Sequence, residues 1–383
     1  MARVLVLGGG SGGLVVAHQL ARHLKDTDHQ VILINRSANH VFMPSLPWVA
    51  TGLKEPEEVQ RPLRLLERQG AHVIQGQVQE VDTAHRRVKV DHETIPYDFL
   101  VVSLGAQMRP DLLPGSEAVY FLWTLEGALK IREALRRFSG GRIVVGLAGT
   151  YHRLSPAPFE LAGLVEFALQ ARGLRSRSEL VMIHPLPQPL SWMGPAVSEA
   201  VADILARKGI RYEGNFNLQA IDPEGRRLIA ADGREILFDL AILLPPCRPP
   251  ALAFHPDTAA RDGTVLVDPA TFRSIADPSV FIIGDMVNPS LHLPPAGVVA
   301  HLQAEFVADQ ILAELKGAYV GRSFHPVAVF MVDFGDDAVM IACDFSPILS
   351  LSGLPICNVL ARSKAVRLLK VAFESMWFSL FLN

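Results

Sequence analysis

Cysteine is scarce in this chain, which has only Cys247, Cys343 and Cys357 among its 383 residues. They form no CxxC pair and no spacing typical of a metal site, so we expect no bound metal. Isolated cysteines usually behave as small buried hydrophobic side chains, and we expect that structural role for all three. Their pattern favours a reducing, cytoplasmic setting.

A surplus of charge of one sign is also missing. Lys and Arg number 36 against 39 Asp and Glu, a formal net charge of −3, so we expect no nucleic-acid partner. Residues 1–10 enter a strand pattern without a basic segment and an apolar segment before it, so no secretion signal is expected. The uncharged stretch 345–361 is broken by Pro347, Gly353 and Pro355, and no membrane-spanning helix is predicted.

Apolar residues, by contrast, are abundant. The chain is 49% hydrophobic and 20% charged, with a mean hydropathy of +0.25. This surplus must be buried in a large core, a cofactor cleft, a homo-oligomer or a lipid surface. The length fits two α/β domains and an appendage.

The first motif is a glycine-rich turn between a strand and a helix. An apolar run at residues 3–7 leads into residues 8–13, and a helical pattern follows to residue 24. The GxGxxG motif in this setting predicts a dinucleotide site, with the helix N-terminus facing a pyrophosphate. The expected binding residues are Gly8, Gly10, Ser11, Gly12 and Gly13.

The second strand, residues 30–34, ends without the acid that usually binds a ribose hydroxyl. Asn35 and Arg36 stand there instead. Asn35 can still hydrogen-bond a ribose, and an arginine beside it suits a ribose 2′-phosphate, so this strand alone leaves FAD and NADPH open.

Two later strands favour FAD. Residues 99–105 form an apolar strand that ends at Gly105, and residues 280–285 form another that ends in Gly284 and Asp285. In two-dinucleotide-domain flavoproteins, which the chain resembles here, such an Asp binds the ribityl chain. The next helix start, near Gly297 and Val298, would point its N-terminus at the flavin.

The predicted fold is α/β, with two Rossmann-like domains for FAD or NAD(P), the second inserted in the first, and a C-terminal amphipathic region. The expected limits are 1–108 and 253–320 for the FAD domain, 109–252 for the insert and 321–383 for the C-terminal region. Elements expected in the insert are strands at 141–146, 179–184 and 238–244 and a helix at 195–208.

The insert has a degenerate nucleotide motif. Gly146 and Gly149 are present, but Tyr151, His152, Arg153 and Pro156 follow where bare backbone and a helix start would be needed. The strand at 179–184 also ends in His184 rather than an acid, which argues against NAD binding.

The last predicted helix covers residues 362–382 and mixes basic with apolar side chains. We expect it to lie in a membrane interface, with docking on a core or a dimer partner as the alternative. The basic residues are Arg362, Lys364, Arg367 and Lys370, and the apolar ones are Val366, Leu369, Phe373, Met376, Trp377 and Phe381.

With these residues placed, the chain resembles the sulfide:quinone oxidoreductase family, together with the flavoprotein subunit of flavocytochrome c sulfide dehydrogenase. The most specific parts are residues 42–50, 156–160 and 333–337 and the apolar tail. The resemblance implies FAD, with Ser45 and Val78 among its contacts, sulfide as donor, a quinone as acceptor and a peripheral, monotopic position on the cytoplasmic side of the cell membrane.

The chain departs from the family where the redox cysteines belong. The resemblance aligns Leu154 and Phe330 with the cysteine pair, and an accessory position near Trp123 also lacks sulfur. Neither side chain can attack as a thiolate or donate electrons. The resemblance implies that a covalent flavin link would use a cysteine near the N-terminal domain. No cysteine precedes Cys247 in this chain, so FAD is expected to be non-covalent.

The catalytic candidates are therefore other polar residues. His301 stands near a position where several family members have lysine, and histidine is a side chain that can carry positive charge or supply a proton. Glu160 and His152 are the other candidates, and any of the three could bind a donor other than sulfide. Two alternatives stay open: a type II NADH:quinone oxidoreductase, and a flavin-binding protein that has lost sulfide oxidation.

Overall fold

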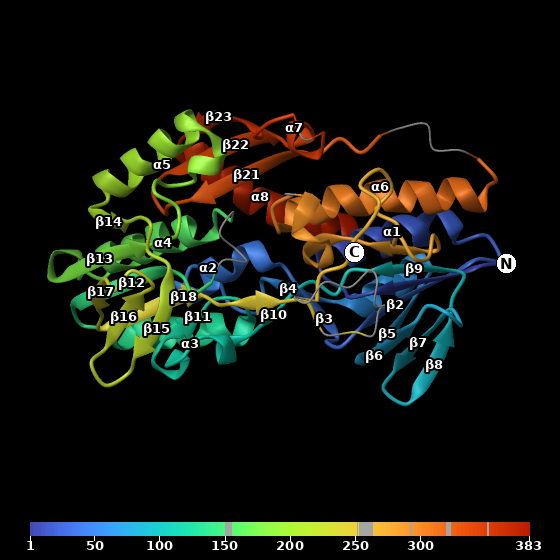
Figure 1. The fold of residues 1–383 in the computed structure, drawn as a ribbon, viewed down its shortest axis with the longest axis horizontal. Helices are drawn as coiled ribbons and strands as arrows, with labels where there is room; N and C mark the ends of the chain where they lie inside the picture. The colour runs from blue at the N-terminus through green and yellow to red at the C-terminus, as the bar shows by residue number, and fades with distance from the viewer. Residues whose placement is uncertain (150–154, 251, 253–262, 292, 319–322, 351) are drawn as a thin grey trace.

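A computed structural model describes residues 1–149, 155–250, 252, 263–291, 293–318, 323–350 and 352–383. Two parallel sheets lie end to end along the molecule, and the antiparallel sheet of the C-terminal region lies on one side, over the second sheet and the middle of the molecule (Figure 1). The expected α/β class with two Rossmann-like folds is confirmed. The exact domain limits stay a prediction.

The first sheet holds the N-terminal motif. Its strands are parallel, in the order β20 (Val280–Ile282), β9 (Phe99–Val102), β1 (Arg3–Leu7), β2 (Gln30–Asn35) and β5 (Ala71–Gln75). Helices α1 (Ser11–Leu24) and α6 (Gly297–Leu315) lie on one side, and antiparallel strands β6 (Val78–Asp82), β7 (Arg87–Val90) and β8 (Glu93–Pro96) on the other (Figure 1). Strand β1 is almost entirely buried because both faces are covered.

The second sheet repeats this plan. Its parallel strands run in the order β11 (Tyr120–Phe121), β18 (Leu240–Leu244), β12 (Gly141–Leu147), β13 (Ser178–Ile183) and β14 (Ile210–Glu213). Neighbouring residues of β12 face opposite sides of the sheet. Val145 packs in the core formed with helices α3 (Leu125–Arg137), α4 (Ala157–Ala171) and α5 (Pro195–Arg207). Val144 packs against strands β15 (Leu218–Asp222), β16 (Arg227–Ala230) and β17 (Glu235–Leu237).

Short elements connect the two sheets. Antiparallel strands β10 (Gln107–Met108) and β19 (Cys247–Arg248) pair where the chain enters and leaves the insert. Strands β3 (Asn39–Val41) and β4 (Gln60–Pro62) flank η1 (Met43–Ser45) and helix α2 (Leu46–Ala50). The other 3₁₀ turns are η2 (Leu63–Gln69), η3 (Pro110–Leu112), η4 (Ser116–Ala118), η5 (Arg175–Arg177), η6 (Ser191–Met193), η7 (Gly284–Met286) and η8 (Pro289–Leu291).

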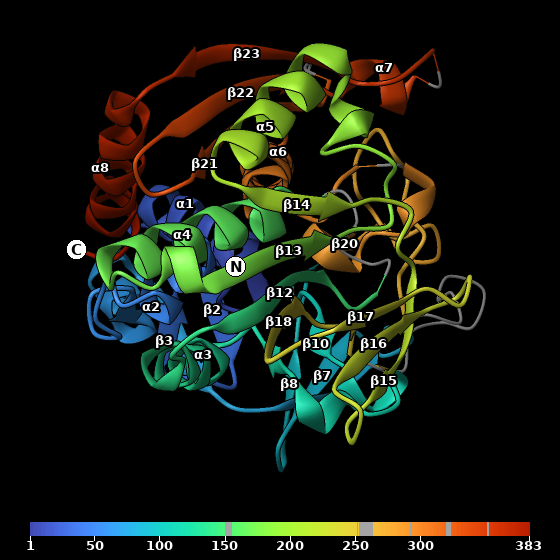
Figure 2. The ribbon, with the colours of Figure 1, turned by 90° about the vertical axis from the view of Figure 1, so that its left-hand side faces the viewer.

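The C-terminal region consists of strands β21 (Val327–Asp333), β22 (Ala338–Asp344) and β23 (Ile356–Arg362) with helices α7 (Ser346–Leu349) and α8 (Lys364–Phe381). Helix α8 lies along one edge of the molecule, beside α1 and α2 (Figure 2). No helix within the described ranges has the length and apolar character that a membrane span requires.

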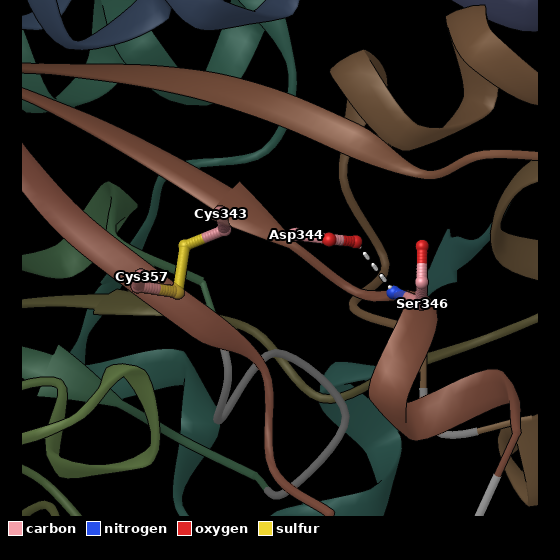
Figure 3. The surroundings of a disulfide bond; sticks show 4 residues. All are labelled: Cys343, Asp344, Ser346 and Cys357. Carbon is pink, nitrogen blue, oxygen red and sulfur yellow. Dashed lines mark hydrogen bonds between the residues drawn. A yellow bond between two sulfur atoms is a disulfide. The ribbon is translucent and has the colours of Figure 1, made fainter. Parts of the chain in front are cut away.

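Two of the cysteines do not have the role expected of them. Cys343 on β22 and Cys357 on β23 are register partners and form a disulfide (Figure 3). The prediction of three unpaired cysteines is therefore wrong, because antiparallel pairing brings together residues that the sequence separates by 14 positions. Cys247 is free and buried, as expected.

Candidate active site

The glycine-rich loop leaves room in front of helix α1. Gly8 has a φ of +98°, and a Cβ there would collide with the Ser103 carbonyl, while a Cβ on Gly13 would collide with the Gly8 carbonyl. A Cβ on Gly10, in contrast, would meet nothing within 4 Å. No side chain caps the first turn of α1, so its backbone N–H groups face open space that suits a diphosphate.

The Gly9 peptide groups are fixed by two side chains. Asn35 Oδ1 accepts a hydrogen bond from Gly9 N at 2.9 Å, and His40 Nδ1 bonds the Gly9 carbonyl at 2.8 Å. Asn35 Nδ2 donates to the Ser37 carbonyl at 2.7 Å. Asn35 thus braces the loop from within, which differs from the expected ribose contact, while Arg36 is exposed.

A second helix start lies beside the first. A Cβ on Gly297, the first residue of α6, would lie 3.1 Å from Ser11 Oγ, so the N-termini of α1 and α6 almost touch. Val298 follows in the first turn of α6, which no side chain caps either. Two positive helix ends at one place favour an anionic ligand.

Gly284 and Asp285 follow β20 on the same side. Gly284 N donates to the buried Gln303 side chain at 2.7 Å, and burial raises the pKa of Asp285 to about 6. Burial, with the Asp285 charge adding to it, raises the pKa of the Cys247 thiol to about 12. Cys247 therefore stays protonated at neutral pH and cannot supply the missing thiolate.

These features fit a flavin dinucleotide. Gly105 has a φ of +63° and open space at its Cβ position, like Gly10. Val78 is buried at the start of β6, and its side chain packs in the core of the first sheet. The site thus offers backbone donors and space rather than charged side chains.

Ser45 has a different partner from the one expected. It is fully buried, and its hydroxyl donates to Glu374 Oε2 at 2.8 Å. Lys54 Nζ lies 2.7 Å from the same oxygen. Ser45 is thereby tied to helix α8.

Glu374 belongs to a set of charges under α8 that we call the α8 ion-pair cluster. Its members are three basic and three acidic side chains: Lys54, Arg367, Lys370, Glu160, Asp333 and Glu374. Trp48 Nε1 donates to Asp333 at 2.8 Å, and the Lys54 and Lys370 ammonium groups lie 5.2 and 5.1 Å from its ring. Pairing of basic with acidic side chains offsets part of the desolvation free energy that burial of these groups costs.

Glu160, one of the catalytic candidates, is part of this cluster. It forms a buried ion pair with Lys370, and burial raises its pKa to about 7. A carboxyl group with that pKa can take up or release a proton near neutral pH.

His301, another candidate, is not brought to Glu160. His301 Nε2 lies 3.2 Å from Glu305, and its ring centre is 5.5 Å from that of Trp377. Trp377 is seven residues beyond Lys370, or about 10 Å along α8 at 1.5 Å per residue. His152 lies outside the described residues, as do Tyr151, Arg153 and Leu154.

At the second cysteine position of the family, Phe330 is 7% exposed and lies 6.3 Å from the Phe345 ring. An aromatic side chain stands at this position, and it cannot act as a nucleophile.

Helix α8 turns three of its four charged side chains, Arg367, Lys370 and Glu374, toward the protein, while Lys364 is exposed. Lys370, Arg367 and the preceding Arg362 all form ion pairs with acidic residues of the protein, so they are not free for lipid headgroups. Several large apolar side chains face outward instead: Leu368, Leu369, Val371, Phe373, Met376 and Leu380 are 36 to 70% exposed. The alternative expectation, a helix docked on the core, fits the inner face of α8.

At the end of β13, in the second sheet, a histidine packs among aromatic rings. His184 is fully buried, burial lowers its pKa to about 3, and its ring lies 5.1 Å from Phe159 and 6.3 Å from Tyr212. Aromatic rings and a neutral imidazole thus occupy the place of a ribose-binding acid.

Two residues at the site, His40 and Glu374, were missed from the sequence, and Trp377 was noted only as an apolar residue of the tail helix. A usable signal was the helical spacing of Lys370, Glu374, Trp377 and Phe381, which defines one face of α8. If the charged residues of that face pointed toward the protein, the spacing would predict buried ion-pair partners for them.

Comparison with known proteins gives a consistent result. The family model described as pyridine nucleotide-disulphide oxidoreductase matches residues 2–304. The chain is 27% identical to the type II NADH:quinone oxidoreductase Ndh of Mycobacterium tuberculosis, over 82% of this chain and 73% of that protein. It is 24% identical to the sulfide-quinone reductase of Aquifex aeolicus, over 89% and 83% respectively.

Among solved structures, the sulfide:quinone oxidoreductase of Aquifex aeolicus superposes with a TM-score of 0.86 at 23% identity and covers 99% of this chain and 91% of its own. The NDH2 of Plasmodium falciparum reaches 0.69 at 14% identity, over 88% and 89%. The resemblance drawn from the sequence is confirmed, and so is FAD as the cofactor. The chain belongs to the pyridine nucleotide-disulphide oxidoreductase family and is an FAD-dependent oxidoreductase.

Proposed function

We propose that this enzyme passes two electrons from a small donor, sulfide first among those to test, through FAD to a quinone held at a membrane surface. The observation that carries the proposal is helix α8, which pairs Arg367, Lys370 and Glu374 with residues of the protein and exposes apolar side chains. Such a face suits both a quinone and the acyl region of a lipid surface.

The FAD would be held without a covalent bond. We infer that the loop Gly8, Gly10, Ser11, Gly12 and Gly13 and the α6 start at Gly297 and Val298 bind the diphosphate. Gly105, Gly284 and Asp285 would face the ribityl chain and flavin. FAD accepts electron pairs from a donor and returns them to an acceptor.

Protons come from the protein. Reduction of a quinone consumes two electrons and two protons, and Glu160 can hold one proton because its pKa is about 7. Lys370 lies one helical turn from the exposed Phe373, which places the Glu160 pair just below the apolar face. His301 would be a second proton-carrying group. It lies on α6, is paired with Glu305 and contacts the C-terminal part of α8 at Trp377.

The names of the type II NADH:quinone oxidoreductase and the sulfide-quinone reductase relatives share a quinone as acceptor, whereas their donors differ. NADH is the second candidate, because relatives at 27% identity carry that name. The buried His184 argues against it, since no acid is available there for a ribose. Sulfide would have to react without the family cysteines, because Phe330 replaces one of them.

An anaerobic absorbance spectrum tests the donor. Sulfide should bleach the oxidised-flavin band, and a short-chain quinone added afterwards should restore it. If NADH bleaches the band and sulfide does not, NADH is the donor. A flavin that neither donor reduces would favour a protein that has lost sulfide oxidation, and a dithionite-reduced flavin that a quinone does not reoxidise would overturn the acceptor.

Binding to vesicles tests the membrane surface. Leu369→Glu together with Phe373→Glu places two charges on the apolar face and should abolish co-sedimentation with anionic phospholipid vesicles. Leu237→Glu is the matched control, since Leu237 is 55% exposed on β17, away from α8. Equal binding by both variants would contradict the proposed surface.

The cytoplasmic side and a homo-oligomer are also part of the proposal. The Cys343–Cys357 disulfide is the feature that opposes a reducing compartment. Alkylation of free thiols in intact cells before lysis decides the side, because two additional reactive thiols would indicate a reduced, cytoplasmic protein. Sedimentation equilibrium of the purified holoenzyme gives the oligomeric state.

A further inference from the structure

Helix α8 reaches the phosphate loop through one histidine. Trp377 Nε1 lies 3.0 Å from His40 Nε2, and the other ring nitrogen of His40 lies 2.8 Å from the Gly9 carbonyl oxygen. The three residues are separated by 337 and 31 positions in the sequence. A hydrogen-bonded chain therefore joins the C-terminal helix to the cofactor loop.

The chemistry of the partners fixes the tautomer of His40. An indole N–H can only donate, so His40 Nε2 must be the acceptor and carries no proton. The ring proton is then on Nδ1, which donates to the Gly9 carbonyl. His40 is 1% exposed, and burial lowers its pKa to about 4, so the neutral form is maintained at physiological pH.

This bond orients the peptide that faces the diphosphate space. In a planar trans peptide the N–H points opposite to the C=O, so holding the Gly9 carbonyl also directs the Gly10 N–H. That N–H points away from His40, and Gly10 has open space around its Cβ position. Asn35 holds the N–H side of Gly9, so the residue cannot rotate freely.

The surroundings of Trp377 keep this geometry rigid. Its ring centre lies 5.5 Å from Phe42, 4.6 Å from Phe381 and 5.5 Å from His301. Trp377 is 4% exposed, so solvent cannot easily take the place of its N–H. If the N–H is lost, His40 Nε2 becomes a buried acceptor without its partner.

We propose that Trp377 and His40 are positioning residues for FAD, through which α8 holds the phosphate loop in its cofactor-binding form. The tail helix then has two roles: its outer face contacts the membrane, and its inner face retains the flavin. The proposal rests on FAD binding and not on the identity of the donor or acceptor.

The decisive variant is Trp377→Phe, which keeps a ring and removes only the N–H donor. We expect FAD to bind about tenfold more weakly, the equivalent of roughly one buried hydrogen bond. The measurement is titration of the apo-protein with FAD, followed by quenching of flavin fluorescence. Val366→Ala is the matched control, because Val366 is buried on the same helix, away from the histidine, and should leave FAD affinity unchanged.

A second variant separates positioning from general stability. Asn in place of His40 can donate to the Gly9 carbonyl from the position of Nδ1 but has no Nε2 to receive the indole. In a His40→Asn background, Trp377→Phe should therefore cause no further loss of FAD affinity. An additional tenfold loss in that background, or an equal loss in Val366→Ala, would overturn the proposal.

A direct reading of the tautomer needs no cofactor turnover. In the holoenzyme labelled with ¹⁵N-histidine, His40 should show a protonated Nδ1 and a bare Nε2 from pH 6 to 8. A protonated Nε2 in the wild-type protein would refute the relay even if Trp377→Phe failed to fold. Failure of sulfide or quinone to react in the spectral test leaves both of these measurements unaffected.

Discussion

Lys370 on α8 and Glu160 on α4 form an ion pair between positions 210 residues apart, with side chains only 7% and 8% exposed. The pair explains how an amphipathic tail can dock on the protein and still expose apolar residues. Charge holds the inner face, so the outer face stays available for a membrane or a quinone.

Lys370→Met tests the contribution of this pair to stability. Loss of the ammonium group leaves the Glu160 carboxylate buried without its partner, which should lower the free energy of unfolding by about 3 kcal/mol. Urea denaturation of the variant measures it. Lys364→Met, at an exposed position of the same helix, is the control, and equal stability of the two variants would contradict a structural role for the pair.

Two glycines of the phosphate loop should respond differently to alanine. Gly13→Ala places a Cβ against the Gly8 carbonyl, so we expect loss of folding or a free energy of unfolding lower by about 3 kcal/mol or more. Gly10→Ala has a permitted φ of −74° and free space, so the apo-protein should be as stable as the wild type. Its FAD affinity should fall at least about tenfold, because the methyl group fills the diphosphate space. Normal FAD binding by Gly10→Ala would place the cofactor elsewhere.

The disulfide predicts a specific thiol count. Denatured, unreduced protein should react with one equivalent of a thiol reagent, at Cys247, and with three after reduction. Cys343→Ala with Cys357→Ala should lower the free energy of unfolding by about 3 kcal/mol through greater chain entropy of the unfolded state. Three reactive thiols before reduction would show that the bond is absent.

Acid should destabilise the protein through its buried histidines. The pKa of His184 is lowered from 6.5 to about 3, so between these values the unfolded chain binds more protons than the folded one. Stability then falls as the pH falls, with a slope of up to about 1.4 kcal/mol per pH unit from this residue. His184→Asn, which keeps an acceptor for the Leu186 N–H, should reduce the slope by that amount between pH 6 and 4.

Denaturation of both proteins across this range measures the difference. Glu160, whose raised pKa acts in the opposite sense between about 4.5 and 7, is common to both and cancels. Parallel pH curves would mean that His184 is not neutral and buried in solution.

Much of the fold could be predicted from local patterns. The strand at 3–7, the helix at 14–24 and the strand at 30–34 depend on residues close in sequence, and all are present, with the helix starting three residues earlier, at Ser11. The degenerate second fold was visible in the same way, because His184 stands directly after its strand. Which face of α8 is buried could not be predicted, since helical spacing defines two faces but does not say which one packs on the protein.

The sequence by itself determined the two nucleotide folds, the FAD motif and the loss of cysteine at Phe330, because each depends on residue type and local spacing. Tertiary structure decided the partners: Asn35 braces Gly9, Ser45 bonds Glu374, Cys343 pairs with Cys357, and Trp377 reaches the phosphate loop through His40. These contacts join positions up to 337 residues apart. Their energies depend on burial and on donor–acceptor geometry, which exist only once the chain has folded.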